Sequence, residues 1–281
     1  MQTSAGAASA LGRHLVRRGP DHRELLGGVI PDFLTIRQWF DFNGVAIGRW
    51  VTRAEQELAA GFFFDALSDL VQILAGRRLQ SYEQIRLGQL LVSLRGTLGL
   101  QYGTGGRPGV AAHYDPARRT FSLAKNAGPG SIAHEWFHAF DHFIADKAFD
   151  CPDSLRLGAG LWLEQPMRSH PLNDQLAACY RAVMLNDDGS ATPLVLHSRT
   201  VDQALGQCYF SRPEELMARS FEAFVQDAGI TNTFLVRGTR NSDDARLGLY
   251  PQGEQRMETG HAFATYFAAL CEALLRQSDL R

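Results

Sequence analysis

The amino-acid sequence predicts an α+β fold that is mostly helical and contains a small mixed sheet. Long stretches place apolar residues at the three- and four-residue spacing of amphipathic helices. One short segment instead has the pattern of two strands joined by a turn, and its last strand leads directly into a helix. At 281 residues, the chain is long enough for a sizeable core and an enclosed site.

Apolar periodicity predicts four helices in addition to the one that carries the motif described below. They are expected at residues 54–75, 81–95, 212–228 and 257–276. Gly76 provides a stop for the longest of them. The 212–228 helix has Ser211 as its expected N-cap and Pro213 in its first turn, where proline is favoured.

The strands are expected at residues 110–114 and 120–124, with a turn at 115–119. The glycine-rich residues 103–109 before them lack the sequence context of a phosphate-binding loop, and we interpret them as a turn. The unpaired edge of such a sheet can hydrogen-bond an extended peptide. A sheet that only packs against the following helix explains the sequence equally well.

Residues 134–142 carry the most informative motif, His-Glu-Trp-Phe-His-Ala-Phe-Asp-His. On a helix, His134 and His138 lie one turn apart on the same face, so this HExxH pattern can bring two imidazole nitrogens to one zinc ion. Glu135 is placed to act as a general base toward a water molecule. The opposite face has the apolar stripe of a buried helix, formed by Ile132, Trp136, Phe140 and Phe143. Two surface histidines on an ordinary amphipathic helix are the alternative.

A catalytic zinc site needs a third protein ligand. His142 is excluded, because it lies eight residues after the first histidine, which is about 12 Å along a helix. The ligand should therefore come from another helix, and the 212–228 helix offers Glu214, Glu215 and Glu222. Glu215 and Glu222 share one face, and the residues alone do not distinguish between them.

Other side chains near the motif are candidates for supporting roles. Asp141 lies on the same helix face as both histidines, where a carboxylate can accept the N–H of a ligating imidazole and fix its orientation. Cys208 lies near the candidate third ligands and is a further candidate ligand. The four cysteines are scattered without a CxxC pair, which predicts reduced thiols in a cytoplasmic protein.

Composition argues against several other classes of function. The formal net charge of −2 gives the body of the protein no electrostatic reason to bind nucleic acid or a membrane. The N-terminus lacks the pattern of a secretory signal, and no stretch is expected to be apolar over the length needed to span a bilayer. No feature of the sequence indicates an oligomeric state.

We expect a mobile basic tail over residues 1–24 and a single domain over residues 25–281. Within that domain, a helical part would cover residues 25–105 and the metal-site part residues 106–281. Residues 150–205 contain several proline, glycine and aspartate breaks without sustained periodicity. This composition predicts an irregular insertion that covers the motif helix.

The histidine motif, taken with the downstream segment Glu215-Leu216-Met217-Ala218-Arg219-Ser220-Phe221, resembles the gluzincin metallopeptidases related to anthrax lethal factor. This resemblance implies that Glu215 completes the zinc site and that Tyr209 assists catalysis.

A wider part of the chain resembles the large polyvalent protein-associated domains, which are zincin-like modules of phages and mobile elements, and their bacterial stand-alone relatives, the CLCA_X family. The similar segments lie at residues 42–50, 65–70, 112–114 and 130–136. This resemblance implies a zincin-like fold, and we expect it to extend from about residue 38 to residue 228.

Together these observations predict a zinc-dependent peptidase that acts on a peptide or protein substrate, with Glu135 as general base. One alternative is a zinc-binding accessory module of a phage or mobile element without robust peptidase activity. A second alternative is a di-iron carboxylate protein. It arises because Glu135 and His138, and likewise Glu258 and His261, have the Glu-x-x-His spacing of such bundles.

Overall fold

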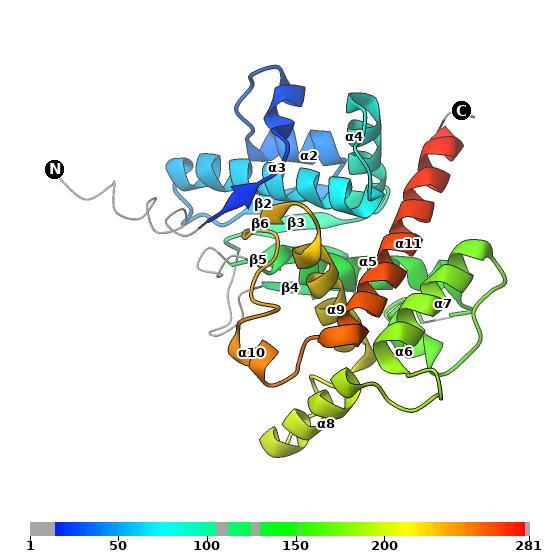
Figure 1. Cartoon of the computed structure of the whole chain (residues 1–281). Coiled ribbons are helices and arrows are strands. Elements are labelled where there is room, and N and C mark those ends of the chain that lie inside the picture. The colour runs from blue at the N-terminus through cyan, green and yellow to red at the C-terminus, as the bar shows by residue number, and fades with distance from the viewer. Residues whose placement is uncertain (1–14, 105–111, 125–129, 152, 279–281) are drawn as a thin grey trace.

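The computed structural model describes residues 15–104, 112–124, 130–151 and 153–278. It is an α+β fold that combines many helices with a small mixed sheet (Figure 1). The helices are η1 (His22–Leu26, 3₁₀), α2 (Phe33–Phe40), α3 (Arg53–Ala75), α4 (Ser81–Leu87), η2 (Gly88–Val92, π), α5 (Ile132–Ala148), α6 (Gly158–Trp162), α7 (Pro171–Met184), α8 (Pro193–Leu205), α9 (Pro213–Asp227), α10 (Asp243–Arg246) and α11 (Gly253–Ser278). The strands are β1 (Arg17–Arg18), β2 (Gly44–Ile47), β3 (Gly99–Tyr102), β4 (Ala112–Asp115), β5 (Thr120–Leu123) and β6 (Thr231–Asn232).

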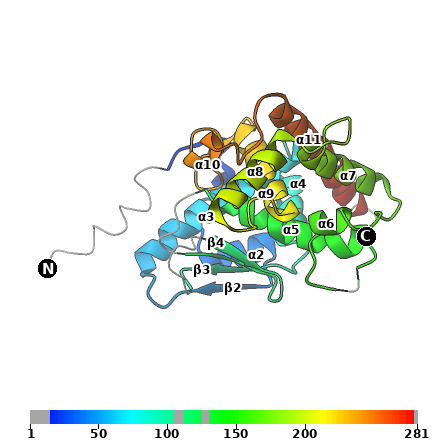
Figure 2. The same ribbon diagram turned by 90° about the horizontal axis from the view of Figure 1, so that it is seen from below.

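The main sheet has the strand order β2-β3-β5-β4. Strands β2, β3 and β5 run parallel, whereas β4 is antiparallel to β5 and forms an edge. The predicted strand–turn–strand segment is therefore confirmed as β4 and β5, and β5 is the last strand before α5, as expected. Strand β4 packs against α5, so its free edge lies beside the motif helix (Figure 2).

Helix α3 is the long central helix that the sequence predicts. The side chain and backbone of Thr52 form a capping box with Glu55 at its start, and Gly76 ends it with a left-handed φ of 65°. By length and composition α3 is apolar enough to cross a membrane, which corrects our expectation that no stretch approaches that length. However, 83% of its most apolar window is buried inside the protein, so α3 is a core helix here.

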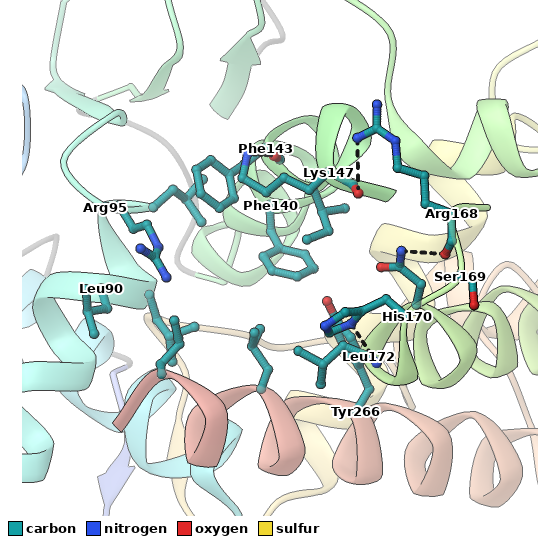
Figure 3. Close-up of a pocket in the computed structure, with 16 residues that line it drawn as sticks. Leu90, Arg95, Phe140, Phe143, Lys147, Arg168, Ser169, His170, Leu172 and Tyr266 are labelled. Carbon is teal, nitrogen blue, oxygen red and sulfur yellow. Dashed lines mark hydrogen bonds between the residues drawn. The ribbon is translucent and has the colours of Figure 1, made fainter. Parts of the chain in front are cut away.

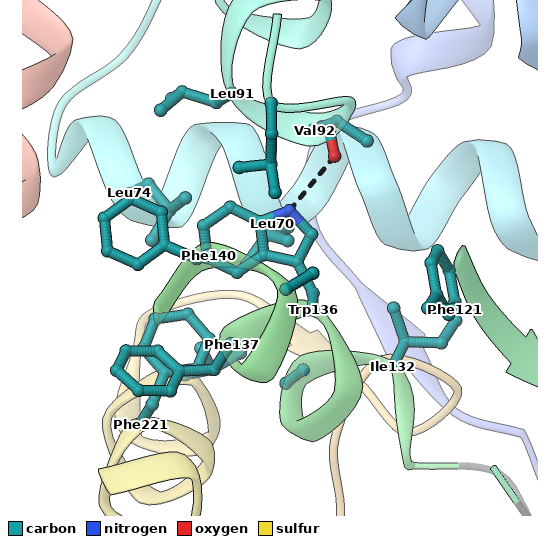
Figure 4. Close-up of a cluster of buried hydrophobic side chains, with 14 of the residues drawn as sticks. Leu70, Leu74, Leu91, Val92, Phe121, Ile132, Trp136, Phe137, Phe140 and Phe221 are labelled. Carbon is teal, nitrogen blue, oxygen red and sulfur yellow. Dashed lines mark hydrogen bonds between the residues drawn. The ribbon is translucent and has the colours of Figure 1, made fainter. Parts of the chain in front are cut away.

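An aromatic cluster fixes α5 against α9 and α11. The ring centroids of Phe137 of α5 and Phe221 of α9 lie 4.9 Å apart, and Trp136 stacks on Phe140 with a centroid distance of 5.4 Å (Figure 4). Trp136 also donates a hydrogen bond of 3.2 Å to the carbonyl of Val92. In the predicted apolar stripe of α5, Ile132, Trp136 and Phe140 are therefore buried and Phe143 is partly buried. The polar face of α5 is turned toward α9 and β4.

Residues 150–205 do not form the irregular insertion that we expected. Most of this segment is helical, with α7 packed against α11 and α8 following it. Pro171 and Pro193 occupy the first turns of α7 and α8, and the side chains of His170 and Thr192 cap these helices. We had interpreted the prolines as breaks, whereas proline is favoured where a helix begins.

The predicted 81–95 helix is shorter than expected. The α-helix α4 ends at Leu87, and the π-helix η2 continues the helical segment to Val92. The segment does not reach residue 95, because Leu94 and Arg95 have left-handed φ values of 53° and 60°. Of the predicted glycine-rich turn, residues 105–109 lie outside the described residues.

Residues 15–24 are not the tail that we expected, because they pack on the domain. Strand β1 pairs with β6, and Arg17 binds Asp69 of α3 through both carboxylate oxygens at 2.8 Å. Arg23 binds Asp65 of the same helix at 2.6 and 3.0 Å. Residues 1–14 lie outside the described part of the chain.

Candidate metal centre

The polar faces of α5 and α9 bring three side chains to one point. The Nε2 atoms of His134 and His138 lie 3.0 Å apart, and each lies 3.4 Å from a carboxylate oxygen of Glu215. Four tetrahedral ligands with zinc bonds of about 2.0–2.1 Å would lie about 3.3 Å from one another. The spacing of these three groups therefore fits a zinc ion, and helix α9 supplies the third group of the cluster.

The hydrogen bonding of Glu215 gives an independent test of this fit. Glu215 is only 8% exposed, and its Oε2 atom is buried without a hydrogen-bond partner. A buried carboxylate oxygen without a partner is costly, and such groups are usually satisfied by protein, water or an ion. A cation held between Glu215 and the two histidines would satisfy it, so the donor set fits a metal by chemistry as well as by distance.

Glu222, one of the two alternatives for the third ligand, lies behind His134 instead of beside the ion position. Its Oε2 atom is 3.0 Å from His134 Nδ1, and it accepts a hydrogen bond of 3.3 Å from the Tyr250 hydroxyl. A carboxylate at Nδ1 holds the proton on that nitrogen and leaves the lone pair of Nε2 free for a metal. Glu222 therefore has the geometry of the supporting carboxylate that we had assigned to Asp141.

Asp141 is turned away from the histidines, which corrects that assignment. It accepts hydrogen bonds from the backbone N–H of Ala159 at 3.0 and 3.1 Å and from the Tyr180 hydroxyl at 2.8 Å. A Cβ atom at Gly158 would come within 2.5 Å of that hydroxyl, so the backbone of α6 approaches Asp141 closely. Burial raises the pKa of Asp141 to about 6, against the effect of these hydrogen bonds. Asp141 thus anchors α6 to α5.

The protonation of the cluster follows from its burial and its charges. Burial alone would raise the pKa of Glu215, but the adjacent imidazoles of His134 and His138 hold it far below its usual range. Burial would lower the pKa of His134, yet the neighbouring carboxylates Glu222 and Glu215 raise it well above its usual value. For Glu135, burial dominates and raises the pKa.

The three side chains open into a cleft of about 430 Å³. The edge strand β4 forms one wall, with His113 and Tyr114 among the lining residues. Glu135, Glu214 and Tyr209 also line the cleft. The motif helix, the edge strand and the loop before α9 therefore all border one cavity.

Tyr209 lies in the loop before α9, is 38% exposed, and has a raised pKa because of burial and the nearby charge of Glu215. Asp202, near the end of α8, holds this loop. Its carboxylate accepts hydrogen bonds from the backbone N–H groups of Tyr209, Phe210 and Ser211 at 3.1, 3.0 and 2.8 Å, and from the Ser211 hydroxyl at 2.6 Å. Ser211 therefore donates its hydrogen bonds to Asp202 and does not cap α9. Arg212 occupies the N-cap position that we expected for Ser211.

Asp202 is a positioning residue that sequence reasoning missed, because we had treated α8 as part of an irregular insertion. The signal available in the sequence was an acidic residue seven positions before Tyr209.

Of two further histidines near the cluster, His113 lines the cleft and His142 contacts the lining residue Tyr114. His142 donates from Nε2 to the carbonyl of Ser154 at 2.6 Å, so its Nδ1 accepts a hydrogen bond of 2.6 Å from the Tyr114 hydroxyl. His142 therefore connects β4 to α5 and has a structural role, which agrees with its exclusion as a metal ligand. His113 lies on the exposed side of β4, and its charge acts to lower the pKa of Glu135. We had given His113 no role.

The remaining candidates do not join the cluster. Among the described residues, the metal-capable group consists of His134, His138 and Glu215. Cys208 is exposed and unpaired with another cysteine. Glu258 and His261 lie in exposed positions on α11 and are outside this group, so the second half that a di-iron site requires does not form there.

The comparisons with known proteins bear mainly on the C-terminal part of the chain. The family model of the large polyvalent protein-associated domain 1 matches residues 201–274. This match supports the polyvalent-domain resemblance, but it overlaps our expected range of 38 to 228 only from residue 201 onward. The matched segment contains Asp202, Tyr209, Glu215 and Glu222, whereas α5 lies outside it. No curated protein and no solved structure matches the chain.

Proposed function

We propose that this protein is a zinc-dependent peptidase of the gluzincin type with a zincin-like fold. The observation that carries the proposal is the convergence of His134, His138 and Glu215 beside the buried carboxylate of Glu135, in a cleft bordered by an edge strand. A zinc ion held by these three ligands would lower the pKa of a water molecule and polarise a carbonyl group.

The side chains around the cleft have separate roles in this proposal. Glu135 accepts the proton of the attacking water, and its raised pKa brings the carboxyl closer to the range in which a general base works well. The Tyr209 hydroxyl donates a hydrogen bond to the oxyanion as charge develops on it. Glu222 orients His134.

Strand β4 supplies the substrate contact. Its edge has no partner strand among the described residues, and it borders the cleft. The backbone N–H and C=O groups of such an edge can pair with a peptide in the extended conformation. The exposed edge therefore supports a peptide or an extended protein segment as the substrate class in this proposal.

The family match favours a second candidate function, an accessory module of a phage or mobile element that binds zinc without robust hydrolysis. The presence of Glu135 beside the ligands weighs against it, because a purely structural zinc site has no use for a general base. A zinc-binding module and a peptidase differ in one measurable property, the effect of removing that base.

The test is a peptide-library assay of the full-length protein and its Glu135→Gln variant. The variant should keep its metal and its melting temperature but lose hydrolysis by several orders of magnitude, because an amide cannot accept the proton of water. Glu214→Gln is the matched control, since Glu214 lines the same cleft outside the ligand group, and it should keep most activity. Equal hydrolysis by wild type and Glu135→Gln would overturn the mechanism, and no hydrolysis by either would favour the accessory module.

A further inference from the structure

A second cavity lies on the side of α5 that faces away from the metal centre. Its volume is about 500 Å³, and α5, α7, α11 and η2 contribute to its walls (Figure 3). Phe140, Phe143 and Ile144 line it from α5, whereas the histidines and Glu135 of the same helix line the other cleft. The volume is within the range of about 300–1,000 Å³ that small-molecule sites occupy.

The apolar lining of this cavity is mostly aliphatic, with Phe140, Phe143 and Tyr266 as its aromatic members. Six leucines from three different parts of the chain line it, namely Leu90, Leu91, Leu94, Leu172, Leu270 and Leu274. Flexible aliphatic walls are complementary to an alkyl chain, because burying such a chain removes apolar surface from water without leaving a polar group unpaired.

The charged side chains of the lining are all basic. Arg95, Lys147 and Arg168 line the cavity, and no carboxylate is present among its described lining residues. Lys147 and Arg168 are paired with Asp146 and Asp150, which lie outside the lining.

Arg95 is different, because its guanidinium donates to the neutral amide of Gln277 at 2.7 Å and keeps its positive charge for another partner. Figure 3 shows the Arg95 side chain reaching from the turn after η2 toward the space between α5 and α11.

We propose that this cavity binds a medium-chain aliphatic carboxylate, with the alkyl chain among the leucines and the carboxylate on Arg95. The two features of the lining, a mostly aliphatic interior and a basic rim without acidic groups, are both needed for this assignment. Guanidinium–carboxylate pairs are strong and geometrically specific, so Arg95 is the residue that selects the acid over an alcohol of the same length. This binding is independent of the proposed peptidase reaction.

The test is calorimetric titration of the full-length protein with decanoate below its micelle concentration. Three matched probes separate the contributions: acetate carries the charge without the chain, decanol the chain without the charge, and decylammonium the chain with the opposite charge. We expect saturable binding of decanoate and no detectable binding of acetate or decylammonium. Decanol should bind about tenfold more weakly than decanoate, since one charge-assisted contact is lost.

Two variants locate the site. Arg95→Gln should weaken decanoate binding about tenfold and leave decanol binding unchanged. The control Arg53→Gln, an exposed arginine at the start of α3, should bind as wild type does. Leu270→Trp fills the cavity and should abolish binding of both probes, with Ile144→Trp as a second filling variant if the first does not fold. Equal binding of decanoate and decylammonium, or full binding by a folded filled variant, would overturn the proposal.

Discussion

Asp69 and Glu215 are both buried carboxylates with depressed pKa values, but only the Asp69 carboxylate has hydrogen-bond partners for both of its oxygens. Asp69 on α3 is fully buried and has both oxygens occupied. Arg17 binds both oxygens at 2.8 Å, Asn232 donates at 2.8 Å, and His22 lies at 3.1 Å. These partners come from β1, η1 and β6, so Asp69 joins segments that are distant in the sequence.

The imidazoles of His134 and His138 lie 3.4 Å from the Glu215 carboxylate, which is long for a hydrogen bond, and the buried Oε2 atom of Glu215 has no hydrogen-bond partner. A carboxylate that the fold leaves incomplete is a candidate for a functional position, whereas a saturated one has a structural explanation. The comparison predicts that substitutions at Asp69 change stability and that substitutions around Glu215 change metal binding and turnover.

The largest effect expected on the structural side is that of Asp69→Asn. Removing this charge leaves Arg17 without its buried partner, so the free energy of unfolding should fall by about 3–5 kcal/mol. Urea denaturation measures this loss. Asp65→Asn, which removes the partner of the more exposed Arg23, is the matched control and should cost about 1 kcal/mol or less. The comparison fails if Asp69→Asn abolishes zinc binding in the folded protein or leaves stability unchanged.

The Tyr209→Phe variant tests the functional half of this comparison, the side chains around Glu215. Its turnover should fall by about 10²–10³-fold with little change in KM, because the hydroxyl acts only as charge develops in the transition state. Zinc content and melting temperature should stay at wild-type values. Asp202→Asn, which loosens the loop that holds Tyr209, should lower kcat in the same direction by a smaller factor. Reduced stability with intact turnover in Tyr209→Phe would make this tyrosine structural.

Glu222→Gln should weaken zinc affinity by about 10–100-fold, because the amide is a poorer acceptor for His134 Nδ1. Asp141→Asn should leave zinc affinity near that of wild type, since its hydrogen bonds go to Ala159 and Tyr180. Competition with a chromogenic zinc chelator measures both. The opposite ranking of the two variants would restore Asp141 to the supporting role and remove Glu222 from it.

The smallest effect concerns acid stability. Burial raises the pKa of Asp69, but hydrogen bonds from His22, Arg17 and Asn232 outweigh it and hold the pKa below its unfolded value of about 3.9. The stability that Asp69 contributes is therefore present above about pH 4 and is lost as the pH falls through its folded value. In urea denaturation at a series of pH values, the gap between wild type and Asp69→Asn should stay constant above about pH 4 and narrow below it. A gap that stays constant into strong acid would contradict the assignment.

The sequence predicts those parts of the fold that depend on local patterns. Helices α3, α5, α9 and α11 lie where apolar periodicity places them, and the alternating segment forms β4 and β5. The pairing of His134 with His138 also follows from the sequence, because one helical turn fixes it.

The errors concern signals that only tertiary structure resolves. Pro171 and Pro193 can either interrupt a helix or begin one, and packing against α11 decides which for α7. Arg17 finds its partner 52 residues away, so its local sequence resembles an exposed tail. The roles of Glu215 and Glu222 depend on how α9 is rotated against α5, and the aromatic packing of Phe221 fixes that rotation.

Metal analysis of the purified full-length protein tests the central claim most directly. The account predicts about one zinc per chain in the wild-type protein and the loss of most of it in Glu215→Ala, with zinc retained in Asp69→Asn. Two irons per chain, or undiminished zinc in a folded Glu215→Ala variant, would contradict the assignment of this site.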